Sequence, residues 1–174
     1  MLVLYRDLFD HMEWADARIW DAVLETSHAR DDEGIRAILV HIHSAQRAFF
    51  DAWAGQPPAF RTPADFPDVA ALYEYAIGYY PAARNLIESL DDSRLDEVLA
   101  LPWVGLVEER IGRAAAPTTV GETMMQVISH TTHHRAQISV RLRLLLGGEP
   151  PVVDYIAWIW FGRPQPQWPV APVR

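Results

Sequence analysis

The chain has 174 residues, of which 50% are hydrophobic and 22% charged, a balance typical of one globular domain with a sizeable core. Its net charge of -8 disfavours binding to nucleic acid and to anionic membranes, since both present phosphates. The absence of cysteine excludes disulfides, thiolate metal sites and a cysteine nucleophile. The N-terminus lacks the features of a signal peptide, and no apolar run is long enough to span a membrane, so we expect a cytoplasmic protein.

Apolar residues at helical spacing predict four long helices. Asp31 or Asp32 can cap the second helix, and Thr119 with Glu122 has the pattern of a capping box at the start of the fourth. Pro81 lies inside the third pattern, where it would kink or split the helix. The predicted helices cover about residues 2–26, 33–54, 69–90 and 119–146.

The remaining segments are shorter. Residues 95–113 contain short apolar runs bounded by proline or glycine, which predict a small β-hairpin or an irregular loop. A short fifth helix is expected over residues 152–161, and the proline-rich tail from Gly162 should be extended or loose. We therefore expect an all-α, antiparallel four-helix bundle in residues 1–161 with a short extra C-terminal helix, followed by the tail of residues 162–174.

Histidines cluster on the fourth predicted helix, at His130, His133 and His134. Helix positions i and i+4 lie about 40° apart, so His130 and His134 point the same way and can bind one metal ion. The i, i+3 pair of His130 and His133 is a competing possibility. Imidazole accepts zinc, nickel, iron or cobalt, and the sequence does not choose among these metals.

A third ligand is expected from a facing helix. His41 lies at the edge of the apolar stripe of the second helix and can reach the bundle interior. His43 is about 200° around the helix from His41 and is expected to face outward. His11 on the first helix can line the same cavity. The alternative for each residue alone is an ordinary packed or solvated histidine.

Four segments along the chain form a further pattern. They are His11-Met-Glu-Trp-Ala-Asp16, His41-Ile-His-Ser-Ala45 followed by Phe49-Phe50, His130-x-x-His133-His134-Arg135-x-Gln137, and Pro150-Pro-Val-Val-Asp154-Tyr155. Taken in this order, the segments resemble proteins of the DinB/YfiT type. The resemblance runs from the first helix to Tyr155, and its most specific part lies on the fourth helix. Asp16 and Ala136 depart from the family's usual Asn and Gly, at positions that are not metal ligands.

The resemblance implies a four-helix bundle with a metal site of three histidines and open coordination positions, often in a homodimer. Its ligands fall on His41, His130 and His134 of this chain. Arg135 is expected in a salt bridge or, alternatively, in contact with an anion. The residues expected to support the ligands or to touch a substrate are His133, Gln137, Arg135, His11 and Trp14.

The family's relatives include mycothiol-dependent maleylpyruvate isomerases and bacillithiol transferases. We therefore expect a divalent metal ion (Zn, Ni or Fe) and a low-molecular-weight thiol cosubstrate, with transfer of the thiol to an electrophilic small molecule. One alternative is a metal-dependent hydrolase that uses Glu13, Asp16 or Asp154 as its base. Another is a non-enzymatic, stress-related binding or interaction module, whose structural metal would be closed by four protein ligands.

Overall fold

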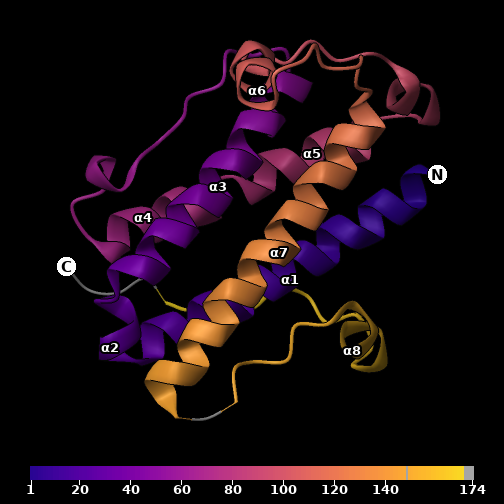
Figure 1. The fold of residues 1–174 in the computed structure, drawn as a ribbon. Helices are drawn as coiled ribbons and strands as arrows, with labels where there is room; N and C mark the ends of the chain where they lie inside the picture. The colour runs from indigo at the N-terminus through magenta and orange to yellow at the C-terminus, as the bar shows by residue number, and fades with distance from the viewer. Residues whose placement is uncertain (148, 171–174) are drawn as a thin grey trace.

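A computed structural model describes residues 1–147 and 149–170, and within these residues the regular structure is helical, with one isolated β-bridge and no strand (Figure 1). The predicted all-α fold is thereby confirmed. No described helix is long and apolar enough to cross a bilayer. The helices are α1 (Leu2–Glu25), α2 (Ser27–Arg30), α3 (Glu33–Trp53), α4 (Val69–Ile77), α5 (Tyr80–Ser89), α6 (Val104–Ile111), α7 (Val120–Leu146) and α8 (Tyr155–Trp160).

The long helix α7 lies between α3 and α1 and makes its main helix–helix contacts with these two (Figure 1). The remaining side of the core is covered by α4, which packs on α3, and by α5, which packs on α1. Since α3 and α7 run side by side, residues almost ninety positions apart in the sequence can meet between them.

The predicted starts of the second and fourth long helices, α3 and α7, are confirmed by their N-terminal caps. Asp32 accepts a hydrogen bond from the backbone N–H of Ile35 at 2.7 Å, and Thr119 and Glu122 form the expected capping box. The third predicted helix is split into α4 and α5, and Pro81 lies in the first turn of α5, where a missing backbone N–H costs nothing.

The hairpin expected over residues 95–113 is wrong, and the alternative of an irregular loop holds for residues 97–103 rather than for the whole segment. This segment holds the end of a 3₁₀ turn (Asp92–Asp96) and the helix α6, which ends at Gly112 with φ 69°. The proline and glycine that were interpreted as strand boundaries instead lie at the two ends of a helix. Val98 does pair in a bridge, but with Thr119, immediately before α7.

The tail contains no helix over residues 163–170, as expected, but it is not loose. The Trp168 ring packs against the rings of Tyr73 and Tyr80, with centroids 6.1 and 5.3 Å away. Its indole N–H donates to Glu13 Oε1 at 3.2 Å. Trp168 thus ties the tail to α1, α4 and α5. Residues 171–174 lie outside the described residues, and the proposed division at residue 161 stays a prediction.

Candidate metal centre

Three histidines from two helices meet where α3 runs beside α7. His41 from α3 and His130 and His134 from α7 each offer a ring nitrogen, and these nitrogens all lie within 4.8 Å of one another. The Nε2 atoms of His41 and His130 are 3.0 Å apart, and the three ring centroids are separated by 4.4–4.8 Å. The predicted grouping of these residues is confirmed, and we call them the histidine triad.

The triad lies at the protein surface rather than in the bundle interior, which corrects our expectation for His41. His41 is exposed, and His130 and His134 are half-buried. His43, expected to face outward, is instead only 1% exposed. The two histidines do point in opposite directions, as expected. The buried side of α3 includes the polar Gln46, however, so a stripe drawn through apolar residues alone was displaced toward His41.

The surroundings of the triad favour the neutral form of two of its imidazoles, His41 and His130. Burial, together with the neighbouring rings of His134, His41 and His133, lowers the pKa of His130 to about 4. Burial and His134 also lower the pKa of His41 below its ordinary value. A neutral imidazole is the form that binds a metal ion, so these two side chains are in their ligand form at neutral pH.

Gln137, one turn beyond the triad on α7, joins two of the α7 histidines. Its Oε1 lies 2.8 Å from His134 Nδ1, and its Nε2 lies 3.2 Å from His133 Nε2. His133 itself is exposed and is not a member of the group that can hold a metal. Spacing alone left open whether His134 or His133 joins His130 as a ligand. The structure places His130 and His134, the i, i+4 pair, beside His41.

Arg135, between the triad and Gln137 in sequence, turns the other way, into the core. It forms a salt bridge to Asp16 at 2.8 Å, with side-chain exposures of 3% and 4%. A further hydrogen bond joins its Nη1 to the carbonyl of Met12 at 3.2 Å. The expected salt bridge is therefore present, and the Arg135 side chain is almost fully shielded from solvent.

His11 and Trp14 face α8 rather than the triad. His11 lines a groove of about 490 Å³ between α1, α7 and the segment before α8, and its Nε2 lies 2.9 Å from the carbonyl of Val153. Its ring contacts those of Tyr155 and Trp158. Trp14 is buried beside Phe161, at the same end of the molecule. The structure does not bring either residue to the metal site.

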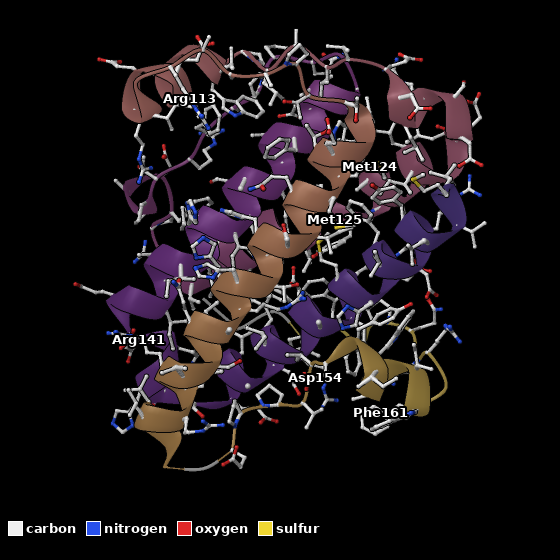
Figure 2. All side chains as sticks on the ribbon, turned by 45° about the vertical axis from the view of Figure 1, so that its right-hand side comes forward. Arg113, Met124, Met125, Arg141, Asp154 and Phe161 are labelled. Atoms are coloured by element: carbon white, nitrogen blue, oxygen red, sulfur yellow. The ribbon has the colours of Figure 1, made fainter. Side chains whose placement is uncertain are left out.

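The three carboxylates considered as bases also lie outside the triad, and two of them are held in ion pairs. Glu13 pairs with Arg84 at 2.6 Å, and Asp16 pairs with Arg135 in the core. Asp154 immediately precedes α8, which lies on the side of α7 away from α3 (Figure 2). Within the described residues, the group that can hold a metal consists of the three histidines alone.

The comparison with known families agrees with this arrangement. A model of the DinB family matches residues 1–167. The chain belongs to the DinB family. The match includes every residue of the triad and both helices that carry it, but it ends just before Trp168. No curated protein matches the chain.

The triad fits a divalent transition-metal ion. Tetrahedral zinc with Zn–N bonds of about 2.0–2.1 Å holds its ligand nitrogens about 3.3 Å apart. The 3.0 Å between the Nε2 atoms of His41 and His130 is close to that spacing. Neutral nitrogen ligands suit zinc, nickel and iron and are poor ligands for calcium and magnesium. The DinB-family chain can therefore hold one such ion through His41, His130 and His134.

Sequence reasoning missed a polar group in the core, formed by Trp20, His43 and Gln46. The Trp20 indole N–H donates to His43 Nε2 at 2.9 Å, and His43 Nδ1 lies 2.7 Å from Gln46 Oε1. Gln46 in turn donates to Asp16 Oδ2 at 2.9 Å. One sequence signal was available, since the spacing of His43 and Gln46 is that of His134 and Gln137.

Proposed function

We propose that this chain is a metal-dependent enzyme that transfers a low-molecular-weight thiol to an electrophilic small molecule. The observation that carries the proposal is the triad of His41, His130 and His134, which supplies three neutral ligands and is partly open to solvent. Three protein ligands with an open position are typical of catalytic sites, whereas a structural zinc site is closed by four.

The chemistry follows from the charge of the site. A divalent ion held by three neutral imidazoles keeps its full positive charge and lowers the pKa of a thiol that reaches it. The protein contributes no thiol of its own, because the sequence contains no cysteine. The thiol therefore comes from a cosubstrate; it loses its proton, its sulfur bonds to the electrophilic carbon, and the leaving group departs with its electron pair.

Hydrolysis is supported less well. It needs a base beside the ion, and two of the three candidates, Glu13 and Asp16, are held by Arg84 and Arg135. The third, Asp154, immediately precedes α8. Thiol transfer needs no such base once the thiol is ionised. A purely structural metal is also supported less well, because the possible ligand group in the described residues has three members.

The enzyme acts as a homodimer in the cytoplasm, where low-molecular-weight thiols are kept reduced. A dimer is supported by apolar side chains that α7 and α1 leave exposed to solvent, namely Met125, Val140, Leu144, Val3 and Leu4. Sedimentation equilibrium of the wild type and of Val140→Glu/Leu144→Glu tests this part: a dimer that dissociates in the variant is expected, and a monomeric wild type would contradict it.

The reaction is tested with protein reconstituted separately with Zn²⁺, Ni²⁺ or Fe²⁺. Each form is incubated with bacillithiol, mycothiol, glutathione or free cysteine and with the electrophile 1-chloro-2,4-dinitrobenzene, and thioether formation is followed by absorbance. We expect turnover that needs both metal and thiol and that disappears in His130→Ala/His134→Ala. Metal-loaded wild type that transfers none of these thiols, to this or to a wider panel of electrophiles, would contradict the proposal.

A further inference from the structure

The chain contains two histidine–glutamine pairs with the same local geometry. In each pair the glutamine follows the histidine by three positions on a helix, and its Oε1 lies within hydrogen-bond distance of the imidazole Nδ1. The separation is 2.7 Å for His43 and Gln46 on α3 and 2.8 Å for His134 and Gln137 on α7. The first pair is buried and the second is at the surface beside the triad.

The buried pair shows which tautomer this geometry selects. The Trp20 indole N–H can only donate, so His43 Nε2, 2.9 Å away, must accept and carry no proton. In a neutral imidazole the proton is then on Nδ1, which donates it to Gln46 Oε1. The amide of Gln46 is oriented independently, because its Nε2 donates to the carboxylate of Asp16 at 2.9 Å.

The surface pair repeats the contact between the glutamine Oε1 and the imidazole Nδ1, with two differences among the described residues. No tryptophan donates to His134 Nε2, and the glutamine Nε2 meets His133 rather than a carboxylate. We infer that Gln137 is a positioning residue, which holds the His134 imidazole in the tautomer with the proton on Nδ1 and leaves the Nε2 lone pair for the metal ion. This inference rests on the proposed metal site and adds the residue that prepares one of its ligands. Hydrogen bonds of this kind to the non-ligating nitrogen fix ring orientation and raise ligand basicity.

The second contact of Gln137 accounts for the position of His133. The Gln137 amide nitrogen lies 3.2 Å from His133 Nε2, to which it donates. The Nε2 lone pair of His133 is thereby occupied, although its ring lies only 4.9 Å from that of His134. One amide thus leaves the Nε2 lone pair of His134 free and occupies that of His133, the adjacent histidine outside the triad.

The test compares Zn²⁺ affinity, measured by competition with a chelating dye, in Gln137→Leu and Gln137→Glu. The leucine removes both hydrogen bonds and should weaken Zn²⁺ binding by about 10- to 100-fold. The glutamate keeps an acceptor for His134 Nδ1 and should restore the affinity, which a merely structural role would not predict. Gln126→Leu, the same change at another exposed position of α7, serves as the matched control and should bind Zn²⁺ like the wild type.

A second measurement needs no metal. Long-range ¹H–¹⁵N correlation spectra of the metal-free protein report which nitrogen of His134 carries the proton. We expect the Nδ1–H form in the wild type and in Gln137→Glu, and a mixture of tautomers in Gln137→Leu. An Nε2–H form in the wild type, or unchanged Zn²⁺ affinity in Gln137→Leu, would overturn the inference. Failure of the wild type to bind Zn²⁺ would instead overturn the proposed function, while the tautomer spectra would still decide the role of Gln137.

Discussion

The buried polar group around His43 and the histidine triad share helices α3 and α7, and the buried group also uses α1, but the two have different roles. In the core, the polar side chains of this group bond one another: His43 bonds Trp20 and Gln46, and Arg135 bonds Asp16. At the surface, His41, His130 and His134 converge on one another with an open side. His41 and His43 are two positions apart on α3, and His134 and Arg135 are adjacent on α7, yet the members of each pair belong to different regions. We therefore expect changes in the buried group to affect stability and changes in the triad to affect metal binding.

The largest expected effect comes from breaking the ion pair of the buried region. Arg135→Met leaves Asp16 charged and without its guanidinium in the core, and removal of one partner of such a pair costs about 3–5 kcal/mol of unfolding free energy. Urea denaturation of metal-free protein measures it. Arg143→Met is the matched control, because its salt bridge to Glu149 is exposed and should contribute at most about 1 kcal/mol. Equal effects of the two changes would contradict the distinction between the regions.

Loss of the Trp168 side chain, which covers the buried polar group, should have the next largest effect on the unfolding free energy. Trp168 packs on Tyr80, whose hydroxyl bonds Asp16. Because Trp168 is only half-buried, Trp168→Ala should lower the unfolding free energy by about 1–3 kcal/mol, less than a fully buried tryptophan would. Trp160→Ala, at a position that is 75% exposed, should change it by less than about 0.5 kcal/mol. An unfolding temperature of Trp168→Ala equal to that of the wild type would mean that the tail does not stabilise the core.

Acidification should affect the triad in a defined direction. The pKa of His130 is lowered from its ordinary 6.5 to about 4 in the folded protein. The unfolded chain therefore binds more protons between these values, and the contribution of neutral His130 to stability, present above about pH 6.5, is lost as the pH falls toward about 4. Metal-free wild type should lose more thermal stability over this range than His130→Gln. Identical pH profiles would show that the ring is not held neutral.

The smallest expected effect on folding comes from the triad itself. In metal-free protein, His41→Ala removes an exposed side chain and should change the unfolding free energy by less than about 0.5 kcal/mol. With Zn²⁺ at about 100 times its dissociation constant, the wild type alone should gain about 2.7 kcal/mol by linkage. Differential scanning calorimetry with and without Zn²⁺ measures both. A large loss without metal would place His41 among the residues that stabilise the fold.

The comparison also explains what the sequence could and could not predict. Helical periodicity located the long helices, and the i, i+4 spacing identified His130 and His134, because both signals are local. Which side of α3 faces the core is a tertiary property. A polar residue such as Gln46 normally indicates the solvent side, so a stripe that left it out was displaced toward His41, and His41 and His43 were exchanged.

Two other elements depended on contacts between segments far apart in sequence. No residue of α6 is buried, so no core contact marks this segment as a helix, and its bounding proline and glycine suggested turns. Trp168 lies in a proline-rich tail that composition alone describes as loose, yet its partners are on α1, α4 and α5. The role of Gln137 required the position of both of its amide atoms, which spacing does not give.

The most direct test of the metal site is the metal content of protein purified without a histidine tag, measured by mass spectrometry beside His130→Ala/His134→Ala. A site formed by His41, His130 and His134 predicts close to one divalent transition-metal ion per chain in the wild type and its loss in the variant. A wild type that holds no metal even after reloading, or a variant that retains as much as the wild type, would contradict it.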